Sequence, residues 1–300
     1  MSGESSIRSR VRSVVSLAAY FVIYTILVLP ISAYGADLLD NEAIPNIVVT
    51  DKYLVAPDEL LSSKIPLPAS DVPLSVERLN SDVIERSGFR ALGPLLQAST
   101  SAIANPASGG AFNEILLRGF GNTPVFRNGL NDSAGSLPIR PLANVQYIEV
   151  LKGPYGALYG PGEPGGSINF VTKTPQAQAA IDLDVGFGSY DELILQLDST
   201  GPLLPSEDLN YRFIAQHEES ETFRDFATQQ RWFVNPMLSW QPRENLSFDA
   251  TFEYMHDKRR VDTGIVAIDN SVRLNENRFL GEPATRPATV DGYTVQLSSK

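Results

Sequence analysis

The second half of the chain alternates apolar and polar residues with a period of two, in segments of about ten residues. In the first segment Ile181, Leu183, Val185 and Phe187 alternate with polar or small residues. Four more segments repeat the pattern, with apolar positions at Leu193, Leu195 and Leu197, at Tyr211, Phe213 and Ala215, at Trp232, Val234, Leu238 and Trp240, and at Phe248, Ala250, Phe252 and Tyr254. Successive side chains of a β-strand point to opposite faces, so the pattern predicts five antiparallel strands and a sixth beginning at Tyr293.

The connections between these predicted strands differ in kind. GPLLPSED and QPREN are short and turn-like, whereas residues 259–288 form a long polar connection. Short turns at one end of a sheet and longer loops at the other are typical of outer-membrane barrels, although a soluble β-sandwich shows the same alternation. Aromatic residues near the strand ends favour the barrel, because such rings concentrate at lipid interfaces. These residues are Trp232, Trp240 and Tyr254.

Between Leu74 and Pro175 the sequence predicts a compact domain that mixes strands and helices. LSVERL is expected to form a strand, Asn80 to Ser87 a short helix, and Ala91 to Ser99 a further turn or two of helix. Four later stretches, each bounded by turn residues, are predicted strands. They read ILLRGF, PVFRNGL, VQYIEVLKG and SINFVTK.

Gly160, Gly162 and Gly165 have the G-x-G-x-x-G spacing of a dinucleotide-binding loop. Such a loop needs free backbone N–H groups and a helix after it, whereas Pro161 and Pro164 each remove a donor and a strand pattern follows. We therefore interpret the stretch as a tight turn. A secreted oxidoreductase, which would need a working nucleotide loop, is disfavoured.

The first 35 residues have the features of a secretory signal peptide. Three arginines precede an apolar run from Val14 to Leu29, and Ala33 and Gly35 are the small residues expected before a cleavage site. An uncleaved anchor helix is the alternative. No later apolar run reaches the roughly 18 residues of a transmembrane helix, so any further crossing would have to use strands. Residues 36–73 are polar and rich in proline, which predicts a flexible tether.

Charge and composition exclude several classes of function. The chain has 24 Lys and Arg against 35 Asp and Glu, a formal net charge of −11, so we expect no nucleic-acid partner. It contains no cysteine, which excludes disulfides and thiolate metal sites. The two histidines, His217 and His256, both fall inside predicted strands without a cluster of other ligands, and no metal site is predicted.

Several motifs, in order along the chain, resemble those of the TonB-dependent outer-membrane receptors, and within them the ferric-siderophore receptors. IVVT looks like the TonB box, and ILLRGF and VFRNGL resemble two strands of the family's plug domain. IEVLKGPYGALYGPGEPGGSINFVTKTP is similar to the family's plug signature, and GSYDELILQLDSTGPL to the start of its barrel. The resemblance implies a mostly β fold, in which a globular α/β plug precedes the first five or six strands of an antiparallel transmembrane β-barrel that has 22 strands when complete.

The implied domains follow the changes in pattern described above. They are a signal peptide (1–35), a periplasmic tether with the TonB box (36–73), the plug (74–175) and the start of the barrel (176–300). The tether leaves too little room before IVVT for the N-terminal signalling domain of some relatives. Because five or six strands do not close the barrel, roughly 400 more residues would be needed, and the open edges would be costly in lipid. As written, the chain is expected not to insert stably by itself, and a non-functional remnant is one alternative.

The resemblance implies active import of a ferric siderophore across the outer membrane of a Gram-negative bacterium. The receptor would be no enzyme and would carry no intrinsic cofactor, since iron would arrive already chelated. Its partners would be the TonB protein with its proton-driven inner-membrane complex, the ferric siderophore and outer-membrane lipid. Cobalamin, haem or a sugar is the alternative ligand for the same scaffold. A passive porin is disfavoured, because it would need neither plug nor tether.

The resemblance also implies roles for individual residues. Ile47, Val48, Val49 and Thr50 would add an extended strand to a sheet edge of TonB, with a disordered linker as the alternative. Arg118 and Lys152 fall on plug bases that pair with barrel glutamates, expected beyond Lys300, with solvated charges as the alternative. Ligand contacts are expected in two apex loops, at Gly121, Asn122 and Thr123, and at Ser136, Leu137 and Arg140. Of these, Arg140 could attract an anionic ferric complex.

Overall fold

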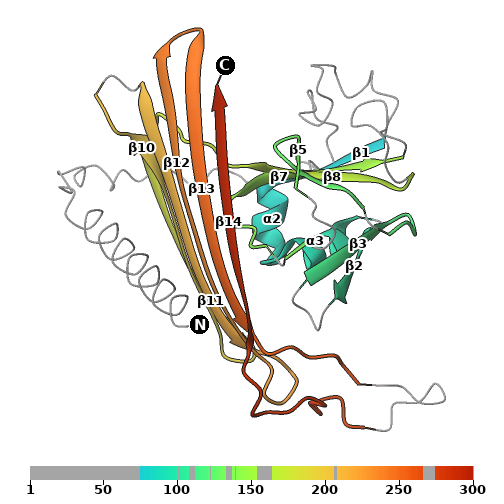
Figure 1. Ribbon diagram of the computed structural model, residues 1–300. Helices are drawn as coiled ribbons and strands as arrows, with labels where there is room; N and C mark the ends of the chain where they lie inside the picture. The colour runs from blue at the N-terminus through green and yellow to red at the C-terminus, as the bar shows by residue number, and fades with distance from the viewer. Residues whose placement is uncertain are drawn as a thin grey trace, which may run out of the picture. The chain divides into compact units, whose positions relative to one another are not determined.

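Figure 1 shows the computed structural model, which describes residues 75–100, 102–107, 112–121, 123–132, 137–138, 140–153, 164–205, 208–265 and 274–299. These residues form a mixed domain up to residue 174 and, after it, a long six-stranded sheet. Among them, neither of the two helices is long and apolar enough to cross a membrane. The predicted signal peptide, the tether and Ile47 to Thr50 lie outside the described residues.

The main sheet of the mixed domain has five strands in the order β1-β7-β8-β4-β5. The central strand β7 (Val145–Lys152) pairs antiparallel with β1 (Ser75–Asn80) and with β8 (Gly166–Thr172). On the other side β8 pairs in parallel with β4 (Val125–Arg127), which turns into β5 (Leu130–Asn131). The strands predicted from LSVERL, VQYIEVLKG and SINFVTK are therefore confirmed, whereas PVFRNGL is divided by a turn at Asn128 and Gly129 into β4 and the start of β5.

Two short helices and a small second sheet cover this main sheet. The helices are α2 (Ser81–Ser87) and α3 (Leu92–Ser99), as predicted, and α2 ends at Gly88 in the left-handed conformation with φ 70°. The second sheet has the order β2-β3-β6 and consists of β2 (Ala102–Ala107), β3 (Phe112–Leu117) and β6 (Leu137–Pro138). Of these, β3 contains only the first three residues of the predicted strand ILLRGF, because the chain turns at Arg118 and Gly119, and β2 was not predicted.

The core of the mixed domain lies between the helices and both sheets. Leu95 and Leu96 of α3 are fully buried and pack in one cluster with Leu117, Ile148 and Ile168 from three different strands. All seven residues of β8 are buried, so its alternating sequence does not correspond to one solvent-exposed and one buried face. Two of its polar side chains find partners inside the protein: Asn169 donates to Glu149, and Thr172 accepts from Asn128.

The six strands after residue 175 form one antiparallel sheet in which each strand pairs with its neighbours in sequence. They are β9 (Ala180–Gly188), β10 (Glu192–Pro202), β11 (Leu209–Glu221), β12 (Thr228–Arg243), β13 (Leu246–Arg259) and β14 (Ala288–Ser299). This confirms all five predicted strands and the sixth. The sixth begins at Ala288 rather than at Tyr293, because residues 288–292 also pair with β13.

The two faces of this sheet differ as the alternation predicts. On the outer face Ile181, Leu183 and Phe187 keep 73%, 73% and 81% of their surface exposed, whereas Asn235 on the inner face is fully buried. Trp232 and Trp240 project from the outer face near opposite ends of β12, about 26 Å apart at ~3.3 Å per residue. That spacing matches an apolar band of about 25 Å with an aromatic girdle at each edge.

The strand connections follow the predicted asymmetry only in part, because six residues separate β11 from β12 at one end of the sheet and six separate β10 from β11 at the other. At one end of the sheet, six residues separate β10 from β11 and two separate β12 from β13, whereas at the other end 28 residues separate β13 from β14. At that same end, however, β9 and β10 are joined by a tight turn in which Tyr190 and Asp191 have φ of 61° and 54°. The side predicted to carry longer loops is therefore mixed.

Candidate functional site

Arg127, the last residue of β4, lies at the centre of the polar contacts between the mixed domain and the six-stranded sheet. The chain turns directly after it, with φ of 49° at Asn128 and 78° at Gly129. The Asn128 side chain fixes this turn: its Oδ1 accepts from the Thr172 backbone at 2.9 Å, and its Nδ2 donates to Thr172 Oγ1 at 3.0 Å. Asn128 Nδ2 also donates to Gln296 of β14 at 3.2 Å. The sequence R-N-G thus directs the Arg127 side chain into the interface.

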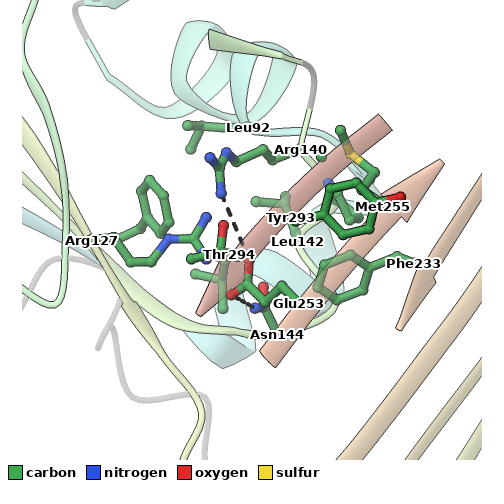
Figure 2. A pocket seen from close by; sticks show the side chains of 14 residues that line it. Leu92, Arg127, Arg140, Leu142, Asn144, Phe233, Glu253, Met255, Tyr293 and Thr294 are labelled. Atoms are coloured by element: carbon green, nitrogen blue, oxygen red, sulfur yellow. Dashed lines mark hydrogen bonds and ion pairs between the residues drawn. The ribbon is translucent and has the colours of Figure 1, made fainter. Parts of the chain in front are cut away.

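Two arginines and two carboxylates meet at this interface, and Figure 2 shows three of the four, Arg127, Arg140 and Glu253. The Arg127 guanidinium contacts Glu253 of β13 through Nη1, and its Nε and Nη2 each lie 3.3 Å from one oxygen of Asp132. Arg140 lies 3.3 Å from the other Asp132 oxygen and 3.7 Å from Glu253. The guanidinium of Arg127 also lies over the Phe170 ring, 5.1 Å from its centroid. Asp132 therefore orients both arginines from within the mixed domain, and Glu253 reaches them from the sheet.

Asn144, just before β7, adds two buried hydrogen bonds between the same two parts of the chain. Its Nδ2 donates to Glu253 Oε1 at 2.8 Å and to Asn235 Oδ1 at 3.0 Å. Asn235 in turn donates to the Phe252 carbonyl at 2.8 Å, which fixes its amide. Glu253 is thus bound through both oxygens, by an amide on one side and by guanidinium groups on the other.

A small cavity of about 80 Å³ adjoins this cluster. Figure 2 shows Arg127, Arg140 and Glu253 directed toward one another, surrounded by mostly apolar side chains. Those labelled in the figure are Leu92, Leu142, Phe233, Met255 and Tyr293. A cavity of this size accommodates a few water molecules, so it is too small to enclose a whole metal chelate.

The electrostatics of the cluster follow from its burial. Burial raises the pKa of the Asp132 carboxyl above its ordinary value and the nearby Glu253 raises it further, whereas the charge and hydrogen bonds of Arg127 lower it. Burial wins because both carboxylates sit in a water-poor interface and repel each other.

Other polar contacts extend the same interface. Lys173 Nζ lies 3.0 Å from Asp198 of β10, and Arg212 of β11 binds that carboxylate through two nitrogens at 2.8 and 2.7 Å. Arg90 lies 3.3 Å from Asp184 of β9. One buried apolar cluster at this interface consists of Ala143, Ile214, Phe233, Met237 and Met255. Ion pairs and amides therefore make up much of the interface between the two parts.

The inner face of the sheet also carries a ladder of charges of its own. Glu218, Arg231 and Asp257 stand directly opposite one another on β11, β12 and β13. Arg231 lies 3.1 Å from Glu218 and 2.9 Å from Asp257, and Arg259 pairs with the same Asp257 at 2.5 Å. No group of three or more histidine and acidic side chains that could hold a metal ion occurs in the part of the chain that the structure describes.

Comparison with known families identifies the mixed domain. Residues 68–167 match the family model for the TonB-dependent receptor plug domain. The chain carries a TonB-dependent receptor plug domain. We therefore call the mixed domain the plug, and the six-stranded sheet, whose strands follow it, the wall.

Curated relatives and solved structures extend the similarity into the wall. The chain is 38% identical over 157 residues to the metal-pseudopaline receptor CntO of Pseudomonas aeruginosa, covering 52% of this chain and 22% of that protein. It is 30% identical over 196 residues to the ferrioxamine receptor of Yersinia enterocolitica, covering 61% and 27%. The chain therefore spans about a quarter of the length of these relatives.

Solved structures show that the fold is that of a plug followed by barrel strands. The ferripyoverdine receptor of the outer membrane of Pseudomonas aeruginosa superposes with a TM-score of 0.71 at 17% identity, over 83% of this chain and 34% of that one. The ferric-catecholate import receptor Fiu from E. coli K12, in its open form, gives a TM-score of 0.69 at 22% identity, over 82% and 39%. The fold class predicted from the sequence is confirmed.

The structure places the predicted plug bases away from the wall contacts described above. Arg118 lies in an exposed turn with φ of 54°. Lys152 lies at the end of β7, where its Nζ is 2.8 Å from Glu77 of β1, a residue of the plug itself. Their pairing with barrel glutamates beyond Lys300 stays a prediction.

The predicted ligand residues are spread over different environments. Gly121 is half-buried, Thr123 is buried, and Leu137 lies in β6. Asn122 and Ser136 lie outside the described residues. Arg140 is the predicted ligand residue that the structure brings into the cluster with Arg127 and Glu253.

Sequence reasoning missed Arg127, Asn144 and Glu253. One usable signal was present, because Glu253 falls on the inward face of the alternating segment from Phe248 to Tyr254. A carboxylate on a face that another domain covers requires a partner there. Which plug residue supplies that partner is not visible in the sequence pattern, since it depends on how the plug packs.

Proposed function

We propose that this chain forms the plug and first wall strands of an outer-membrane receptor that imports a metal chelate, foremost a ferric siderophore, by TonB-dependent active transport. The observation that carries this proposal is a plug domain fixed to the inner face of apolar-sided strands by ion pairs and amides. Those pairs are Arg127 with Glu253, Lys173 with Asp198, and Arg90 with Asp184.

The chemistry of these contacts suits a plug that has to move. Separating apolar surfaces costs roughly 25 cal/mol for each Å² exposed to water. Separated charges, by contrast, regain hydration and so recover much of what the pair contributed. A plug held largely by polar contacts can therefore be firmly placed at rest and still be displaced by an external pull.

The energy source and the partner belong to the proposal. Ile47, Val48, Val49 and Thr50 supply a β-branched segment that can add a strand to a sheet edge of TonB, and backbone hydrogen bonds would provide most of that affinity. The inner-membrane proton gradient drives the pull through TonB. The receptor itself breaks no covalent bond and needs no cofactor of its own.

The metal of the chelate is left open between iron and other transition metals. The relatives include receptors named for ferrioxamine and for metal-pseudopaline, and the latter has the higher identity of the two compared above. This similarity supports a metal chelate over cobalamin, haem or a sugar as the ligand.

Uptake of labelled metal tests the function directly. In cells that express the gene encoding this chain, we expect energy-dependent uptake of iron-55 supplied as ferrioxamine or ferripyoverdine, or of a labelled metal supplied as its pseudopaline complex. Deletion of Ile47 to Thr50 should abolish uptake but leave surface binding of the chelate intact. Uptake that survives both this deletion and an uncoupler would refute active import and favour a passive pore.

A further inference from the structure

The two arginines of the plug cluster are arranged as a binding site and not only as ion-pair partners. Asp132 holds Arg127 through one oxygen and Arg140 through the other, at 3.3 Å in each case. Because all three residues belong to the plug, this arrangement does not depend on the wall. The guanidinium groups are therefore already oriented before Glu253 approaches them.

The charge of this group is unbalanced without the wall. Two guanidinium groups against one carboxylate leave one positive charge on the plug, which Glu253 neutralises from β13. Both arginines reach the same Glu253 oxygen. In effect, Glu253 occupies an anion site that the plug carries.

The neighbouring cavity gives another anion access to the same place. It adjoins Arg127, Arg140 and Glu253 and has room for a few water molecules, or for one carboxylate group. Its apolar walls would strengthen a charge-assisted hydrogen bond formed there, because little water competes.

We propose that Arg127 and Arg140 form a carboxylate-binding site of the plug, which Glu253 fills in this structure and from which a carboxylate of the imported chelate displaces it. This inference rests on the proposed function and specifies its ligand class as a chelate with a free carboxylate. Displacement exchanges one guanidinium–carboxylate pair for another, so ligand binding and release of the plug from β13 become the same event. By thermodynamic linkage the two effects are equal: the contact with Glu253 weakens ligand binding by a certain factor, and bound ligand weakens the contact with Glu253 by the same factor.

The test compares two variants that break the same ion pair from opposite sides. Citrate without metal serves as the probe, and its affinity for the purified receptor in detergent is measured by calorimetry. Glu253→Gln frees the arginines and should tighten citrate binding, whereas Arg140→Gln removes half of the site and should weaken it, each by about tenfold, the effect of one charged hydrogen bond. A purely structural contact predicts that both variants act in the same direction.

Controls separate the site from general loosening of the plug. Lys173→Gln breaks another pair between plug and wall, with Asp198, and should leave citrate affinity unchanged. If Arg140→Gln does not fold, Arg140→Lys replaces it, and weaker binding is again expected because the planar fork is lost. Equal effects of Glu253→Gln and Arg140→Gln, or inorganic phosphate binding as tightly as citrate, would overturn the inference.

The outcome is independent of transport, because citrate binding needs neither metal nor energy. Opposite shifts without any metal uptake would leave the carboxylate site standing and refute the proposed function. Normal uptake with shifts in the same direction would refute the carboxylate site alone.

Discussion

Asn144→Ala should loosen the plug from the wall by an amount that the structure allows us to calculate. The change removes a hydrogen bond of 2.8 Å to the charged Glu253 and one of 3.0 Å to the neutral Asn235. A bond to a charged group contributes about 1.5–3 kcal/mol and a neutral one about 0.5–1.5 kcal/mol. We expect the free energy of plug release to fall by about 2–4.5 kcal/mol, which corresponds to a roughly 30- to 2,000-fold higher population of the released state.

The absence of cysteine from the sequence provides the assay. Ala143 is 5% exposed and packs against Ile214, Phe233, Met237 and Met255, so a thiol at this position is covered while the plug is docked. In an Ala143→Cys background the rate of thiol labelling reports the released fraction, and Asn144→Ala should raise it by the factor given above. Ser239→Ala, which removes a 2.7 Å hydrogen bond to Asp249 within the wall, is the matched control and should leave labelling unchanged. Equal labelling rates with and without Asn144 would refute our account of this contact.

Three further predictions concern the plug and the wall. Gly165→Ala should destabilise the plug by about 3 kcal/mol, because the added Cβ would collide with the Leu117 carbonyl oxygen. Gly88→Ala, at φ 70° with no atom nearby, should cost only about 1 kcal/mol. Urea unfolding of both variants measures the difference. The pKa of Asp132 in the folded chain is raised above its ordinary 3.8. At a pH between the unfolded and the folded pKa, the folded chain still holds this proton whereas the unfolded chain has lost it. Plug stability should therefore fall as the pH rises from the unfolded pKa through the folded pKa. Asp132→Asn should remove this dependence, and an unaltered pH profile in denaturant melts would contradict it. Phe252→Arg, in the middle of β13 on the outer face, should make folding into lipid vesicles less favourable by about 2–4 kcal/mol. Leu204→Arg, in a turn, should make it less favourable by at most about 1 kcal/mol. Equal costs would argue against a lipid-facing wall.

The strands of the wall could be predicted because their two faces differ in surroundings: the outer face is exposed and the inner face is covered by the plug. Every outward position from Ile181 to Phe187 is apolar, and a period of two survives without reference to any partner. The start of the sixth strand was predicted five residues too late. Residues 288–292 pair with β13 through backbone groups, and such pairing is not visible in the side-chain pattern.

The plug was harder to predict where its structure depends on contacts distant in sequence. β2 contains Asn105 and Pro106, residues that disfavour strands, yet it pairs with β3 along its whole length. The G-x-G-x-x-G stretch could be rejected as a nucleotide loop from its prolines. That Gly165 is required by the approach of the Leu117 carbonyl becomes apparent only in three dimensions.

The site itself was predicted in part. Arg140 was chosen for its charge and does join the cluster, but its neighbours Arg127 and Glu253 come from segments that the sequence does not connect. The resemblance to known receptors directed attention to Arg118 and Lys152 instead, and local pattern offered no reason to prefer the arginine of the F-R-N-G turn.

The charge ladder on the inner face of the wall has a mechanical consequence. Glu218, Arg231 and Asp257 are each paired with the strand beside them, so in the described structure their charges are neutralised within the wall. A shift of one residue in register between β11 and β12, or between β12 and β13, would turn one member of a pair toward the outer face and leave the other without its partner. These ion pairs therefore oppose sliding of one wall strand along the next. When a force is applied to the plug, the polar contacts between plug and wall should break before the wall strands shift in register.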